Sequence, residues 1–270
     1  MEEPISLVKR LFYSFIFIIL SLYTVFFAPN WFFFLVVEAF SLVALYEFYE
    51  MAEKKGIFIN KFLGLVFGAT LPFSLYFQGE SVIILVTILC LFIFNFHRRL
   101  KTNSLMSTAV TVFGIFYISF LFSFFAKVKH LEYGTEWVFY ILLVTKMGDA
   151  AAYFVGTKFG KHPLIPHISP HKTIEGAVAN FFTCIIVSLL SFLYIPNVGW
   201  QHFLILGIVL GVLSQLGDLA ESLIKRDVGV KDSGHIPGLG GVLDILDSLL
   251  FTVPFTHYYL TAFLGLKTIL

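Results

Sequence analysis

The chain has 270 residues, of which 58% are hydrophobic and only 13% are charged, and its formal net charge is +1. A soluble domain carries about 25% charged residues, so this composition excludes a soluble globular protein and predicts an integral membrane protein. The near-neutral charge gives no indication of nucleic-acid binding. The two cysteines, Cys90 and Cys184, lie inside apolar runs and indicate no disulfide framework.

Long apolar runs follow one another along the chain, and each is continuous rather than alternating. A membrane-spanning helix needs about 20 apolar residues, whereas the other spanning solution, a closed barrel, requires alternating strands. The sequence therefore predicts an all-α polytopic transmembrane helix bundle. Its nine expected helices are Leu11–Ala28, Trp31–Phe48, Phe62–Phe77, Val82–Phe96, Leu105–Ala126, Trp137–Gly156, Ala177–Ile195, Phe203–Gly217 and Val242–Gly265.

Lysine and arginine predict the orientation, because cytosolic loops carry an excess of both residues. With the N-terminus in the cytosol, 14 of the 18 Lys and Arg residues lie in inside segments, and the outside segments hold Lys127, Lys129 and Lys267. This orientation places both long polar loops, 157–176 and 218–241, in the cytosol.

The two halves of the chain differ in polarity. Residues 1–104 are apolar helices joined by short charged loops, and Glu38 is the one acid that we place well inside them. Packing and catalysis explain that acid equally well. Residues 105–270 carry polar loops punctuated by glycine and proline, and acids at helix ends. We therefore expect 105–270 to be the catalytic transmembrane region and 1–104 to supply supporting helices.

Charge persists longest in residues 214–248, where two acidic helix edges lie. The first edge carries four polar side chains that share one helix face at spacing i, i+3, i+4 and i+7: Asp218, Glu221, Ser222 and Lys225. The second edge carries Asp244 and Asp247, where the last span begins. Carboxylate and phosphate oxygens are the ligands that Mg²⁺ prefers, so the two edges predict a cation site. The glycines between them predict a phosphate cradle. For any one of these residues, a solvated face with ordinary ion pairs is the alternative.

A second polar stretch runs from Asp149 to Gly176. Asp149 lies one helical turn after Lys146, and the two are either a mutually neutralising buried pair or a contact for a cation or substrate. The loop that follows is basic and stiffened by prolines, so we expect it to lie against anionic headgroups. The chain has no G-x-S-x-G motif and no P-loop, so neither of these sites is predicted.

A long set of residues in the second half matches one known pattern. They are Ala152-Tyr153-Phe154, Gly156, Phe159-Gly160-Lys161, Ser169-Pro170, Lys172-Thr173, Glu175-Gly176, Gly217-Asp218, Glu221-Ser222, Lys225-Arg226, Lys231-Asp232-Ser233-Gly234, Pro237-Gly238, Gly240-Gly241, Asp244 and Asp247. Over residues 149–248 this pattern resembles the bacterial type of integral-membrane phosphatidate cytidylyltransferase, also called CDP-diacylglycerol synthase.

The resemblance implies a metal-dependent nucleotidyltransferase of phospholipid biosynthesis, held in the bacterial inner membrane with its active site facing the cytosol. Such an enzyme transfers a cytidylyl group from CTP to phosphatidate and releases CDP-diacylglycerol and pyrophosphate. The implied partners are CTP, phosphatidate and membrane lipids, without nucleic acid. The implied cofactor is Mg²⁺, alone or with a second cation, and the implied assembly is a homodimer.

The resemblance and the chemistry of phosphoryl transfer together assign three groups of residues. Metal binding is expected at Asp218, Glu221, Asp244 and Asp247. Catalytic roles are expected for Asp218, Asp244, Asp247, Lys225, Arg226 and Lys231. Substrate binding is expected at Ser169, Lys172, Thr173, Glu221, Ser222, Asp232, Gly240 and Gly241.

Three departures from the pattern leave alternatives open. Leu239 stands where the family usually has His, Ile245 stands where it usually has Arg, and the loop between Gly234 and Pro237 is one residue short. Loss of an Arg removes a bidentate phosphate contact, so one alternative is an inactive or impaired member of the same fold. Another is a CTP-using relative that acts on an isoprenoid alcohol or an ether lipid. A different class, an ion-coupled transporter, usually shows inverted repeats, which we do not find; its path would use Glu38, Lys146, Asp149 and Asp218.

Overall fold

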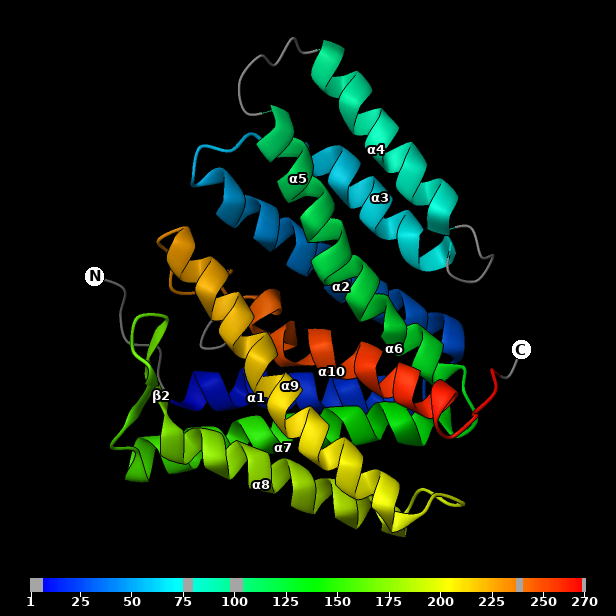
Figure 1. The fold of residues 1–270 in the computed structure, drawn as a ribbon, viewed down its shortest axis with the longest axis vertical. Helices are drawn as coiled ribbons and strands as arrows, with labels where there is room; N and C mark the ends of the chain where they lie inside the picture. The colour runs from blue at the N-terminus through cyan, green and yellow to red at the C-terminus, as the bar shows by residue number, and fades with distance from the viewer. Residues whose placement is uncertain (1–6, 75–79, 98–103, 237–239, 269–270) are drawn as a thin grey trace.

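The computed structural model describes residues 7–74, 80–97, 104–236 and 240–268, and within these ranges the chain forms nine helical segments (Figure 1). They confirm the predicted all-α fold. The segments are α1 Leu7–Phe26, α2 Asn30–Glu53, α3 Lys61–Ser74, α4 Glu80–His97, α5 Ser104–Gly114 continuing through the π-helical turn η1 Ile115–Phe120 into α6 Leu121–Lys129, α7 Gly134–Phe159, α8 Ile174–Leu190 with the 3₁₀ turn η2 Ser191–Leu193, α9 Trp200–Asp227 and α10 Val242–Ala262.

Five of these helical segments are long and apolar enough to cross a membrane: α2, the continuous segment Ser104–Lys129, α7, α8 with η2, and α9. Parts of α1, α3 and α4 form shorter apolar helices. Large apolar side chains stand on the outside of the molecule, with Leu105 82% and Leu193 80% exposed. Such exposure suits lipid rather than water, so the chain is an integral membrane protein.

Two segments differ from the sequence prediction. The helix expected to end at Gly217 continues as α9 to Asp227, so the predicted loop 218–241 is helical over its first part. The predicted loop 157–176 contains an antiparallel hairpin of β1, Pro163–Ile165, and β2, Ser169–Thr173. Prolines are tolerated there because short edge strands leave amide positions free of ladder bonds.

Helices α7, α8, α9 and α10 pack successively on one another. Small residues allow close approach between α8 and α9, because a Cβ on Gly207 would lie 2.8 Å from the Cα of Ile185. The hairpin, the end of α9 and the start of α10 lie on the same side of the bundle (Figure 1). The Arg226 side chain donates to the Ile168 carbonyl at 3.0 Å and fixes the hairpin to the end of α9. The two polar segments are therefore neighbours.

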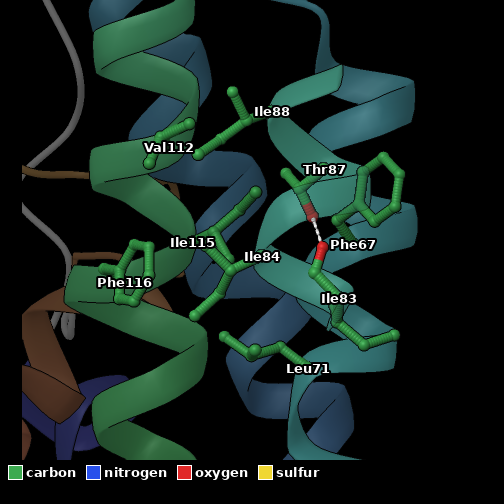
Figure 2. A pocket seen from close by; sticks show the side chains of 9 residues that line it. All are labelled: Phe67, Leu71, Ile83, Ile84, Thr87, Ile88, Val112, Ile115 and Phe116. Atoms are coloured by element: carbon green, nitrogen blue, oxygen red, sulfur yellow. Dashed lines mark hydrogen bonds between the residues drawn. The ribbon is translucent and has the colours of Figure 1, made fainter. Parts of the chain in front are cut away.

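A small apolar void of about 10 Å³ lies between α3, α4 and the α5–η1 segment (Figure 2). Figure 2 shows mainly aliphatic and phenyl side chains around it, and the one hydroxyl, that of Thr87, donates to the Ile83 carbonyl at 2.7 Å. A space of this size holds about one water and offers it no free polar partner. We attribute it to imperfect packing between helices.

Candidate active site

Helices α9 and α10 touch at Gly217, and this contact creates an acidic cluster. A Cβ at Gly217 would lie 2.3 Å from the carbonyl oxygen of Asp247, so only glycine allows the two backbones to approach this closely. The approach brings carboxylate oxygens of Asp218, Glu221 and Asp247 within 4.8 Å of one another. We call these three residues the acidic cluster. Three of the four predicted metal ligands therefore converge.

The acidic cluster has the chemistry of a hard-cation site. Glu221 is fully buried and Asp247 is 7% exposed. Neither carboxylate oxygen of Glu221 accepts a hydrogen bond of good geometry, although the Lys225 ammonium forms an ion pair with one of them. Buried carboxylates are costly without compensation, and an all-oxygen donor set matches Mg²⁺. The residues present fit the implied metal.

The fourth predicted ligand, Asp244, is engaged with the glycine-rich loop instead. One of its oxygens forms an ion pair with Lys225. The other accepts from the amide of Ser233 at 2.8 Å, the hydroxyl of Ser233 at 2.9 Å and the amide of Gly241 at 2.6 Å. Lys225 thus links the acidic cluster to the loop, because it forms one ion pair with Glu221 and another with Asp244. Asp244 closes the loop over the start of α10.

Glu47 on α2 is a site residue that the sequence reasoning missed. Its carboxylate accepts from the first amides of α10, those of Val242 and Leu243, both at 2.9 Å, and from the Ser233 hydroxyl at 2.9 Å. A carboxylate is favourable there because helix N-termini present free N–H groups and positive dipole charge. A Cβ on Gly241 would lie 2.4 Å from this carboxylate. The predicted phosphate cradle at the glycines therefore holds the Glu47 carboxylate.

Lys146 and Asp149 form an ion pair, but it is not buried: their side chains are 39% and 33% exposed, and both residues are tied to α10. The Lys146 ammonium donates to the Ile245 carbonyl at 2.8 Å, to the Ser248 hydroxyl at 3.0 Å and to Asp149 at 3.2 Å. The Ser248 hydroxyl donates to Asp149 at 2.9 Å. Glu38, another charge of the transporter alternative, lies on α2 and is 8% exposed.

A cavity of about 300 Å³ opens between α7, the hairpin, α8 and α9. Its wall carries Lys172, whose ammonium lies 2.7 Å from the Asp218 carboxylate, so the cavity adjoins the acidic cluster. Thr173 caps α8 by accepting from the Gly176 amide at 3.2 Å. The lining is Asp149, Ala152, Tyr153, Gly156, Thr157, Leu164, His171, Lys172, Thr173, Gly176, Ala177, Asn180, Gln215, Asp218 and Leu219. Its size matches the low end of small-ligand pockets.

Comparison with known proteins identifies the family. The profile of the cytidylyltransferase family matches residues 8–263. The chain belongs to this family. A phosphatidate cytidylyltransferase of Bacillus subtilis (strain 168) is 33% identical over 243 residues, which cover 85% of this chain and 88% of the relative. One of Chlamydia pneumoniae is 31% identical over 245 residues, covering 81% of this chain and 79% of the relative. One of Staphylococcus aureus (strain COL) is 39% identical over 160 residues, covering 58% and 60%.

Other residues that carried the family resemblance lie on α9, on the hairpin and beyond the end of α9. Ser222 is buried on α9, and Ser169 opens β2. Arg226 points toward the hairpin, while Lys231 and Asp232 are exposed beyond the end of α9. Gly240 has φ +84° and pairs with Ile236. Pro237, Gly238 and the departure Leu239 lie outside the described residues.

Proposed function

We propose that this chain transfers the cytidylyl group of CTP to phosphatidate and releases CDP-diacylglycerol and pyrophosphate. An oxygen of the lipid phosphate attacks the α-phosphorus of CTP, and the bond between the α-phosphorus and the bridging oxygen to the β-phosphorus breaks. The lipid phosphate is already a nucleophile, so no catalytic triad is needed. The observation that carries this proposal is the acidic cluster beside a lysine-walled cavity. Family membership and the names of the relatives support it.

The acidic cluster would hold Mg²⁺, which when bound offsets the negative charge of the phosphates. Lys172 stands at the boundary between cavity and cluster, where it is placed to contact the triphosphate. Lys225 is neutralised by two carboxylates, so its role is to fix Glu221 and Asp244. Arg226 and Lys231, exposed near the end of α9, add positive charge for an approaching polyanion.

The departure at Ile245 does not leave this turn of α10 without a cation, because the Lys146 ammonium contacts its backbone. The Lys146 ammonium lies 2.8 Å from the Ile245 carbonyl and is anchored by Ser248 and Asp149. Positive charge therefore reaches this turn of α10 from α7 rather than from position 245. This favours an active enzyme over an impaired member of the fold.

The test is turnover by the purified full chain in detergent, with labelled CTP, phosphatidate and Mg²⁺. We expect CDP-diacylglycerol and pyrophosphate from the wild type and a loss of at least about 100-fold in Asp247→Asn, because removing a metal ligand removes charge stabilisation of the transition state. Asp227→Asn is the matched control: it lies at the end of α9, and its side chain is 63% exposed beside Lys55. This control should retain activity.

Three results would count against the proposal. Absence of product from the wild type would reject it, and product from an isoprenoid or ether lipid alone would reject phosphatidate as the substrate. Equal activity of Asp247→Asn and Asp227→Asn would reject the acidic cluster as the reaction site. Product formation that does not require a divalent cation would reject the proposed metal dependence of the reaction.

A cytosolic site in a bacterial inner membrane follows from the same proposal, since CTP is cytosolic and the lipid arrives laterally. A single cysteine at Asp227, at the end of α9 where the side chain is 63% exposed, tests it. In intact cells from which Cys90 and Cys184 have been removed, a membrane-impermeant thiol reagent should label this cysteine only after the membrane is opened.

A further inference from the structure

Gln215 presents a side-chain amide at the wall of the cavity between α7, the hairpin, α8 and α9. It lies on α9 one turn before Asp218, and both residues line the cavity. Residues three apart on a helix are neighbours on its surface. The amide is therefore close to the end of the cavity that adjoins the acidic cluster.

Hydrogen bonds fix the direction in which the Gln215 amide points. Its nitrogen donates to the Gly211 carbonyl at 2.8 Å, and it lies 3.2 Å from the Ala177 carbonyl and 3.4 Å from the side-chain oxygen of Asn180. An amide nitrogen is a donor and an amide oxygen is an acceptor. The reverse orientation would place the Gln215 oxygen against three other oxygens. The nitrogen is therefore held by the helices, and the oxygen is the atom left for a ligand.

The oxygen of this amide, Oε1, is an acceptor that needs a donor. Among the residues that the structure describes, no hydrogen-bond donor reaches it. Gln215 is half-buried, and much of the cavity wall is apolar, with Ala152, Tyr153 and Leu219 among its residues. An amide oxygen accepts from N–H and O–H groups. The donor must therefore come from the molecule that fills the cavity.

The two proposed substrates differ in the donors that they offer. Outside its phosphate, phosphatidate carries only ester oxygens and hydrocarbon, so it has no N–H or O–H group there. The nucleoside of CTP carries the amino group of cytosine and the hydroxyls of ribose. Lys172 and Asp218 stand at the cavity end where phosphate and metal are proposed to lie. A nucleotide whose phosphates reach that end can place its nucleoside beside Gln215.

We infer that the cavity holds the cytidine of CTP and that Oε1 of Gln215 accepts a hydrogen bond from it. Gln215 is then a substrate-binding residue that favours nucleotides carrying the matching donor. The inference rests on the proposed function and assigns this cavity to the nucleotide rather than to the lipid. The donor is the cytosine amino group or a ribose hydroxyl, which share the chemistry of a neutral hydrogen-bond donor.

The test compares nucleotides within each variant of the purified full chain, with Mg²⁺ and phosphatidate present. The variants are the wild type, Gln215→Met and Gln201→Met, because methionine has about the length of glutamine but no amide. Gln201 is the matched control: it lies on the same helix, near its other end, and is exposed. For each variant kcat/KM is measured with CTP, UTP, 2′-deoxy-CTP and 3′-deoxy-CTP, and KM is measured for phosphatidate. UTP lacks the amino group, and each deoxy nucleotide lacks one hydroxyl.

The expected result is a preference that depends on Gln215. The wild type and Gln201→Met should use CTP about tenfold better than the nucleotide that lacks the donor, since an unmatched acceptor loses binding energy. In Gln215→Met this ratio should fall to about one, because kcat/KM falls for CTP but not for the nucleotide without the donor. Ratios within one variant are unaffected by any loss of folded protein, so a purely structural role of Gln215 would not change them.

The nucleotide that shows this dependence identifies the donor. A dependence seen with UTP assigns the cytosine amino group, and one seen with a deoxy nucleotide assigns that hydroxyl. Equal use of all four nucleotides by the wild type, or ratios that Gln215→Met leaves unchanged, would overturn the inference while product from CTP keeps the proposed function. A change in Gln215→Met confined to KM for phosphatidate would overturn it too and assign the cavity to the lipid. If the wild type makes no product from CTP, the proposed function fails, and this inference fails with it.

Discussion

Glu47→Gln tests whether the anchor between α2 and α10 determines the stability of the site. The Glu47 carboxylate accepts two hydrogen bonds at 2.9 Å from the amides of Val242 and Leu243, and it shares the one hydroxyl hydrogen of Ser233 with the Asp244 carboxylate, each at 2.9 Å. Glutamine has the same shape but only one acceptor oxygen, and its amide nitrogen would face a donor. One of the three bonds is lost and the other two lose their charge assistance.

The magnitude follows from these contacts. A hydrogen bond to a charged group contributes about 1.5–3 kcal/mol, and a neutral one about 1 kcal/mol. Losing one charged bond and weakening two others predicts a cost of about 3 kcal/mol in the free energy of unfolding. For a chain of this size that corresponds to roughly 6–12 °C in the melting temperature. Turnover should fall as well, because Ser233 also holds Asp244.

The assay can use a thiol-reactive fluorophore during heating, because the chain has two free cysteines and Cys184 is fully buried until unfolding. Glu50→Gln is the matched control: it is the same change on the same helix, but Glu50 pairs with Lys61 through a side chain that is 45% exposed. Exposed pairs contribute at most about 1 kcal/mol. Equal melting temperatures for the Glu47 and Glu50 variants would show that the Glu47 contacts between α2 and α10 do not stabilise the fold.

Three further substitutions test other contacts of the site. Gly217→Ala should separate α9 from α10, because its Cβ would lie 2.3 Å from the Asp247 carbonyl oxygen. We expect weaker Mg²⁺ binding and a turnover loss of at least about tenfold. An unchanged Mg²⁺ affinity would contradict this prediction. Lys225→Met leaves buried carboxylates without their cation and should cost about 3–5 kcal/mol, measured by thermal unfolding; a change below about 1 kcal/mol would show that the pair is not structural. Lys172→Ala should raise KM for CTP about tenfold, because it removes a charged contact to phosphate. It should destabilise the fold by less than about 1 kcal/mol, because the ion pair of Lys172 with Asp218 is partly exposed. An unchanged KM would show that Lys172 does not contact the nucleotide.

The helices and the face that Asp218 and Glu221 share were predictable from the sequence because both depend on local spacing, whereas the approach of Asp247 depends on the contact of α9 with α10 at Gly217. Apolar runs define the spans, and the spacing of Asp218 and Glu221 defines a shared helix face. The end of α9 was placed too early, because the charged residues after Gly217 resembled a loop. In the structure their charges are paired, as in the ion pair of Lys225 with Glu221, so the helix continues at the membrane edge.

Other parts of the site depend on long-range contacts that leave no local pattern. Glu47 caps a helix that begins 195 residues later in the chain, and nothing in its own neighbourhood distinguishes it from Glu50 and Glu53, which bind Lys61. The contacts between the two halves of the chain could therefore not be predicted from the sequence.

The charges around the site support the proposal that a cation binds there. Six carboxylates surround it and face three ammonium groups: Glu47, Asp149, Asp218, Glu221, Asp244 and Asp247, with Lys146, Lys172 and Lys225. The amides of α10 compensate one carboxylate, that of Glu47, but the excess of negative charge remains. A triphosphate and a lipid phosphate would add to this excess, and like charges repel strongly in a site of low dielectric constant. We therefore propose that positive charge arrives with either substrate, and the acidic cluster offers the oxygen ligands that a divalent cation prefers.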